Sequence, residues 1–265
     1  MNINSPKKII LFGLSSLTLL AAAQACAEDA TARHYAALSL IGDSISVTFE
    51  VETTGSNLDR NKLQKIDIPN NELDSAALLA VDNAVVKIQP GVKTDLLISN
   101  DAGLYRMQGS LFDGSADAGI ALDGLKLALK NNPDITHLVL VTKHRGDARL
   151  KLQNSSFGHG KLEGLGFYVD NRIRSKRGDT QERGRGMIAP YAYVTVRLID
   201  THSWTVLAEK TLDNSNSFAN AGSDRGDSLN AWDALTAAQK TTAIKRLIQA
   251  TVRQTANDVL ADKPA

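Results

Sequence analysis

Hydrophobic and polar residues alternate most clearly in Tyr191–Leu212, which reads YAYVTVRLIDTHSWTVLAEKTL. Residues 191–199 combine a period of two with β-branched and aromatic side chains, the signature of a strand. The polar cluster at 200–203 favours a turn, because short polar side chains bond nearby backbone. A second alternating run then starts at Trp204. A loop of about four residues makes the two strands antiparallel neighbours, so the pattern predicts a hairpin on which further strands and a helix pack.

Several shorter runs predict further strands. Residues 45–51 alternate, and the pair Gly42-Asp43 before them is typical of a tight hairpin turn that follows an earlier strand. Residues 138–141 are continuously apolar, which indicates a strand in the middle of the sheet with both faces covered. The other predicted strands are residues 65–68, 95–99, 105–107, 150–152 and 165–169.

Three stretches repeat apolar residues at the spacing of an amphipathic helix. The predicted helices are residues 74–89 with Asp74 as amino-terminal cap, residues 115–130 with Ser115 as cap, and a last helix from Ala231 or Thr236 to Leu260. The apolar stripe of the last helix consists of Ile244, Leu247, Ile248, Val252 and Val259.

The order is therefore hairpin, helix, strand, helix, strands, hairpin and helix. This order predicts an α/β fold: a mixed, mostly antiparallel sheet with two central helices and a carboxy-terminal helix packed on it. The chain has 265 residues, 43% of them hydrophobic and 22% charged, which is ordinary for one large globular domain.

Four features over residues 75–260 resemble a known group of proteins: the run LVLVTK, the strand ending in VRLID, the run TVLAEKTL and the closing amphipathic helix. Together they resemble the small α/β domains of periplasmic and outer-membrane lipoproteins, such as the curli-secretion channel subunit and the activators of penicillin-binding proteins. The resemblance implies a non-enzymatic envelope protein that works by binding or assembly. This chain departs from that pattern in its leading hairpin and in a long basic insertion.

Residues 1–27 have the composition of an export signal. Two lysines precede an apolar core, which is too short for a bilayer-spanning helix, and small residues follow. Cleavage is expected before Glu28 or before Cys26, and the alternative is lipid attachment at Cys26. We therefore expect a periplasmic protein with one domain at residues 28–265, anchored at the outer membrane if Cys26 is lipidated. Cys26 is the only cysteine, so no intrachain disulfide can form.

The most unusual segment is the basic hairpin, as we call Asp170–Gly186 (DNRIRSKRGDTQERGRG). Its six basic residues oppose three acidic ones, which gives a net charge of +3. The basic residues are Arg172, Arg174, Lys176, Arg177, Arg183 and Arg185. Charge runs are often only solvated, but this one is inserted between two predicted strands. It suits an anionic envelope surface or an acidic envelope protein.

A serine hydrolase is the alternative function. Ser44 follows Gly42-Asp43 and would be the nucleophile, with His137 as base and Asp134 as its partner. The alternating strand predicted after Ser44 opposes this, because such enzymes have a loop and helix there. The five histidines lack metal-ligand spacing, so we expect no metal site. No glycine-rich loop joins a strand to a helix in phosphate-binding order, so we expect no cofactor.

The whole chain carries 30 basic and 29 acidic residues, a balance that argues against nucleic acid as a partner. The sequence thus favours a non-catalytic exported envelope protein, without a transmembrane helix in its mature chain, that binds or assembles through the basic hairpin. Neither its ligand nor its oligomeric state follows from the sequence.

Overall fold

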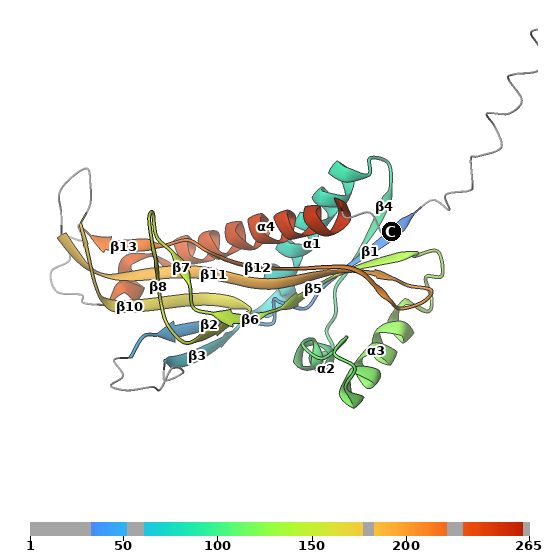
Figure 1. Ribbon diagram of the computed structural model, residues 1–265, viewed down its shortest axis with the longest axis horizontal. Coiled ribbons are helices and arrows are strands. Elements are labelled where there is room, and N and C mark those ends of the chain that lie inside the picture. The colour runs from blue at the N-terminus through green and yellow to red at the C-terminus, as the bar shows by residue number, and fades with distance from the viewer. Residues whose placement is uncertain (1–32, 52–60, 177–182, 222–229, 262–265) are drawn as a thin grey trace, which may run out of the picture. The chain divides into compact units, whose positions relative to one another are not determined.

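The structure is a computed structural model that describes residues 33–51, 61–176, 183–221 and 230–261. Its longest strand, β11 (Arg183–Asp200), forms the spine of a nine-stranded mixed sheet (Figure 1). One edge of β11 pairs antiparallel with β12 (Val206–Ser215) and β13 (Phe218–Ala221). The other edge pairs antiparallel with β10 (Leu165–Lys176) and then with β5 (His137–Lys143). The hairpin predicted from residue 191 to 212 is confirmed as the β11–β12 pair.

The outer strands continue in register beyond β5 and β10. Strand β1 (His34–Ser39) lies parallel between β5 and β4 (Lys93–Leu97). Strand β2 (Ser44–Phe49) lies parallel to β10 and antiparallel to β3 (Lys62–Asp67). Thus β1 and β2 behave as one long strand that is interrupted at residues 40–43, and β5 and β10 as another that is interrupted at 144–164. We call the place where these two interruptions lie side by side the junction.

The tight hairpin turn predicted at Gly42-Asp43 is wrong, because β1 and β2 share no ladder. Each finds parallel partners from later in the chain instead. Alternation of apolar and polar residues indicates that a strand has one buried face, but it does not indicate which strand lies beside it.

Helices α1 (Glu72–Ile88) and α4 (Ala237–Ala261) pack against each other and against one face of the sheet. Two short 3-10 turns precede them, η1 (Pro69–Asn71) and η2 (Ala231–Ala234). The whole predicted apolar stripe of α4 is buried in the core between these helices and the sheet. The carboxy-terminal helix is therefore confirmed in both extent and orientation.

Two different layers cover the opposite face of the sheet. Over β1 and β5 lie α2 (Ala102–Met107) and α3 (Ala116–Leu129), with a second apolar core between. Over β10 and β11 lie two small sheets that cover buried tyrosines. These sheets are β6 (Arg145–Asp147) with β9 (Lys161–Glu163), and β7 (Leu150–Lys151) with β8 (Ser156–Phe157). Figure 1 shows α1 and α4 on one side of the long strands and α2 and α3 on the other.

Strand β5 is buried on both faces, as its continuous apolar run predicts. Val139 and Val141 belong to the core under α1 and α4, whereas Leu138 and Leu140 belong to the core under α2 and α3. The predicted fold class, a mixed sheet with helices packed on it, is confirmed.

The strand predicted at residues 105–107 is wrong, because these residues lie in α2. The Asp101 carboxylate accepts a hydrogen bond from the Gly103 backbone N–H at 2.7 Å and starts that helix. The apolar run there is too short for its periodicity to distinguish a strand from a helix.

Candidate functional site

The basic hairpin is largely a continuation of the sheet. Strand β10 runs to Lys176 and β11 starts at Arg183, so the strands extend well into the segment where the sequence pattern breaks. Residues 177–182, and with them Arg177, lie outside the described residues. A register shift follows Asp170, where Gly186 on the opposite strand adopts a φ of 99°.

Two positions of the basic hairpin hold like charges directly across the ladder. Arg174 is paired with Arg185, and Lys176 with Arg183. Arg174 and Arg185 are both exposed. The Arg185 Nε donates a hydrogen bond to the Asn171 carbonyl at 3.1 Å. Like charges that face each other across two strands repel, so this pair favours an anion between the two side chains.

Arg172 of the basic hairpin lies against two carboxylates. Its guanidinium forms ion pairs with Glu50 and, at 3.7 Å, with Asp170. Both carboxylate side chains are only 7% exposed. Arg172 therefore holds the hairpin to β2, and its charge is compensated within the molecule.

The structure does not bring together the residues of the alternative hydrolase. Ser44 begins β2, and its neighbour Asp43 forms an ion pair with Lys143 at the carboxyl end of β5. His137 lies at the amino end of β5, six residues away, which separates the two sites by roughly 20 Å of strand. Asp134 lies in the turn that precedes β5, three residues before His137 and at the same end of that strand.

His137 makes local contacts within its own end of the sheet. Burial lowers its pKa, with a smaller contribution from Arg33. Its Nδ1 lies 2.8 Å from the Thr136 hydroxyl, and its ring packs against Tyr35 with centroids 5.3 Å apart. Among the described residues no group of three or more His, Cys, Asp or Glu side chains could hold a metal ion.

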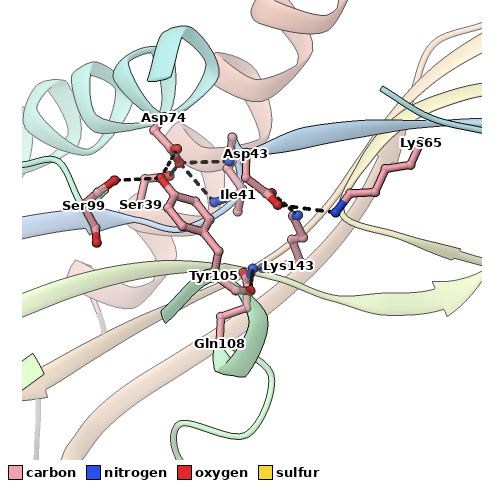
Figure 2. Close-up of polar contacts among 10 residues, drawn as sticks. Ser39, Ile41, Asp43, Lys65, Asp74, Ser99, Tyr105, Gln108 and Lys143 are labelled. Carbon is pink, nitrogen blue, oxygen red and sulfur yellow. Dashed lines mark hydrogen bonds and ion pairs between the residues drawn. The ribbon is translucent and has the colours of Figure 1, made fainter. Parts of the chain in front are cut away.

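At the junction, sequence reasoning missed a buried carboxylate. The Asp74 side chain accepts hydrogen bonds from the Ser39 hydroxyl at 2.6 Å and from the backbone N–H groups of Ile41 and Gly42 at 3.0 Å each. Its second oxygen accepts a hydrogen bond from the Tyr105 hydroxyl at 2.6 Å. Asp74 is 0% exposed, and Figure 2 shows Ser39, Ile41 and Tyr105 around its carboxylate.

This arrangement corrects the prediction that Asp74 caps its own helix. Asp74 is the third residue of α1, and its carboxylate caps the interruption between β1 and β2 instead. Strand pairing leaves the Ile41 and Gly42 N–H groups without sheet partners, and a buried N–H needs an acceptor. Gly42 is required here, because a Cβ on it would lie 2.5 Å from the Asp74 backbone nitrogen.

The second interruption is capped in the same way. The Gln108 side-chain carbonyl accepts a hydrogen bond from the Lys143 backbone N–H at 2.8 Å, and its amide donates to the Tyr105 carbonyl at 2.7 Å. Beside it the Lys143 ammonium pairs with Asp43, which Lys65 also approaches to 3.6 Å (Figure 2). Side chains from α1 and α2 therefore fix the junction of the long strands.

Burial and hydrogen bonding act in opposite directions on Asp74. Burial raises the pKa of its carboxyl group, and the hydrogen bonds from Ser39, Tyr105, Ile41 and Gly42 only partly offset this. Burial and the nearby Asp74 carboxylate also raise the pKa of Tyr105. With every neighbouring donor engaged and the carboxylate fully covered, the geometry is that of a structural link.

Comparison with protein-family models and with curated proteins gives no match. Among solved structures, the chain is distantly similar to a Xanthomonas campestris protein of family DUF330, with TM-score 0.30, 10% identity, and coverage of 86% of this chain and 81% of that one. A PelC dodecamer from Paraburkholderia phytofirmans gives TM-score 0.27 and 9% identity, covering 86% and 89%.

A Helicobacter pylori protein, described as homologous to a neuraminyllactose-binding hemagglutinin, gives TM-score 0.31 and 8% identity, covering 86% and 79%. At such low TM-scores and identities we draw no function from these likenesses. The resemblance to the curli-secretion channel subunit and to the activators of penicillin-binding proteins stays a prediction. No helix among the described residues is long and apolar enough to span a membrane.

Proposed function

We propose that this protein is an exported, non-catalytic protein of the cell envelope, periplasmic or held at the outer membrane, that binds an anionic envelope surface through the basic hairpin. The sequence supports export through residues 1–27. The observation that carries the binding role is the exposed Arg174–Arg185 pair, two like charges held directly opposite each other on the ladder.

An anionic surface would make the electrostatic energy of this arginine pair favourable. Phosphate groups between the two guanidiniums replace repulsion by attraction, and each cation near an anionic membrane contributes about 1 kcal/mol at physiological ionic strength. Arg172 contributes less, because Glu50 and Asp170 already neutralise it. Most of the binding energy is therefore expected from Arg174 and Arg185, which lie beyond the register shift.

The test is co-sedimentation of the purified protein with vesicles of phosphatidylglycerol and of phosphatidylcholine. Charge reversal of both arginines, Arg174→Glu with Arg185→Glu, removes two attractive charges and adds two repulsive ones, so it is expected to weaken binding to phosphatidylglycerol by at least about 30-fold. The matched control is Arg246→Glu with Arg253→Glu, two exposed arginines on α4. We expect the control to bind within a few-fold of the natural protein.

Two results would contradict the proposal. One is equal binding of the natural protein to the neutral and the anionic vesicles. The other is an equal loss of binding in the hairpin variant and in the α4 variant, since that would mean that only total charge matters.

A further inference from the structure

A second polar site lies next to the junction, on the face of β2 that is turned away from α1 and α4. It is a cleft with a volume of about 320 Å³. Alternate residues of β2 contribute three hydroxyl groups, those of Ser44, Ser46 and Thr48. The other lining residues are Leu63, Lys65, Lys143, Arg145, Lys161, Leu162, Glu163, Leu165 and Tyr191. The cleft thus combines a hydroxyl-rich strand with four cationic side chains.

Thr48 is the observation that points to a ligand. This residue is 3% exposed, and its hydroxyl oxygen has no well-formed hydrogen bond in the described part of the chain; its polar neighbour is the Tyr191 hydroxyl, which interacts with both Thr48 and Ser46. The Tyr191 hydroxyl is nearby, and burial raises the pKa of Tyr191 to about 12. A buried hydroxyl whose polar neighbour is shared with a second hydroxyl is only partly compensated for its lost hydrogen bonds to water. A ligand hydroxyl at this end of the cleft would complete the hydrogen bonding of Ser46, Thr48 and Tyr191.

Charge at the junction end of the cleft favours an anionic ligand. The ammonium groups of Lys65 and Lys143 share one carboxylate, that of Asp43 (Figure 2). Lys143 is 14% exposed at its side chain and Lys65 is 60% exposed. Two cations on one carboxylate leave a positive charge for a further anion, and the exposed Lys65 can turn towards it without breaking the Lys143–Asp43 pair.

Two glycines keep this space open. A Cβ on Gly164 would lie 2.8 Å from the Lys143 side chain, and Gly164 has a φ of +61°. A Cβ on Gly166 would lie 2.0 Å from the Ser46 carbonyl oxygen and 2.5 Å from the Tyr191 hydroxyl. The side chains of Lys143 and Tyr191 can therefore pass over β10 into the wall of the cleft only because these two positions have no side chain.

We propose that this cleft binds a small hydroxylated anion of the size of a sugar phosphate or sugar acid. The shared chemistry is one phosphate or carboxylate at Lys65 and Lys143, with the hydroxylated body against Ser46 and Thr48. The volume is at the lower end of the range for small-molecule sites, which excludes long polymers from full enclosure. This site is separate from the basic hairpin and does not depend on the function proposed above.

Isothermal titration with four probes tests the ligand chemistry: glucose 6-phosphate, glucuronate, inorganic phosphate and glucose. Binding of glucose 6-phosphate or glucuronate in preference to glucose is expected, and the stronger of the two identifies the anionic group. Inorganic phosphate is expected to bind more weakly, because it has no hydroxylated body. Glucose binding as tight as that of the anions, or no binding of either sugar anion at millimolar concentration, would overturn the proposal.

Paired variants locate the site. Lys65→Met is expected to weaken sugar-anion binding about tenfold, the effect of losing one hydrogen bond to a charged group. Lys62→Met is its matched control, because Lys62 lies on the same strand three residues away, on the opposite face. Equal effects of the two substitutions would refute the assignment.

Thr48→Val keeps the shape of the side chain and removes only the hydroxyl. We expect it to weaken sugar-anion binding several-fold while leaving the stability of the free protein unchanged or increased. A purely structural hydroxyl would give the opposite result, lower stability with unchanged binding. The variant with Arg174→Glu and Arg185→Glu should bind the sugar anion normally, which separates this site from the basic hairpin.

Discussion

Removal of the Asp74 carboxylate is the most informative test of the fold. Asp74→Ala leaves the backbone N–H groups of Ile41 and Gly42 and the hydroxyls of Ser39 and Tyr105 without their acceptor. Each buried donor that loses its partner costs about 1–3 kcal/mol. The three fully buried donors alone thus sum to roughly 3–9 kcal/mol. Relief from burying a carboxylate returns part of this, so we expect a net loss of about 3–5 kcal/mol in the free energy of unfolding.

Urea denaturation at neutral pH measures this loss, with Asp82→Ala as the matched control. Asp82 lies in the same helix, is only partly buried, and is expected to change stability by less than about 0.5 kcal/mol. A loss for Asp74→Ala that is no larger than that of Asp82→Ala would refute the reasoning, because it would mean that the β1–β2 interruption needs no acceptor.

A double-mutant cycle with Tyr105→Phe tests whether the contact itself is responsible. Tyr105→Phe alone removes one charge-assisted hydrogen bond and is expected to cost about 1.5–3 kcal/mol. In the Asp74→Ala background the Tyr105 hydroxyl keeps only its long contact with the Ser99 carbonyl, at 3.4 Å, so the same change should cost much less. Equal costs in the two backgrounds would show that Tyr105 acts through packing and not through Asp74.

Two further predictions concern the same region of the sheet. Burial raises the pKa of Asp74 above its ordinary value of 3.8. Just above pH 3.8 the folded state therefore holds a proton on Asp74 that the unfolded state has released, so stability falls as pH rises through the pKa of the folded state. Asp74→Asn has no such proton, and denaturation at pH 4 and pH 7 should show the natural protein losing stability relative to the variant; a relative gain would mean that the pKa is lowered. Gly166→Ala should lower the free energy of unfolding by about 3 kcal/mol, because its Cβ would lie 2.0 Å from the Ser46 carbonyl oxygen. The control is Gly124→Ala in α3, where a Cβ meets nothing within 4 Å, and it should raise the free energy of unfolding by about 0.5–1 kcal/mol. Equal effects of the two substitutions in urea denaturation would contradict the close approach of β2 and β10 at Gly166.

The basic hairpin shows how far a charge run can be interpreted from sequence. The run itself is visible, and so is its position between two strands. The ion pair that neutralises Arg172 cannot be recognised from the sequence, because its partner Glu50 lies 122 positions away. Likewise, the opposition of Arg174 and Arg185 depends on the register shift at the bulge, which moves one strand relative to the other.

By itself the sequence determined the elements whose evidence is local: the β11–β12 hairpin, the doubly buried β5 and the apolar stripe of α4. Period and turn chemistry are properties of neighbouring residues, so they can be recognised without the fold. Tertiary structure alone decided that β1 and β2 form one interrupted strand, that Asp74 caps the interruption, and that hydroxyls and lysines line one cleft. Those arrangements depend on which distant strand supplies the next hydrogen-bond partner, and alternation along a single strand is the same whichever neighbour it meets.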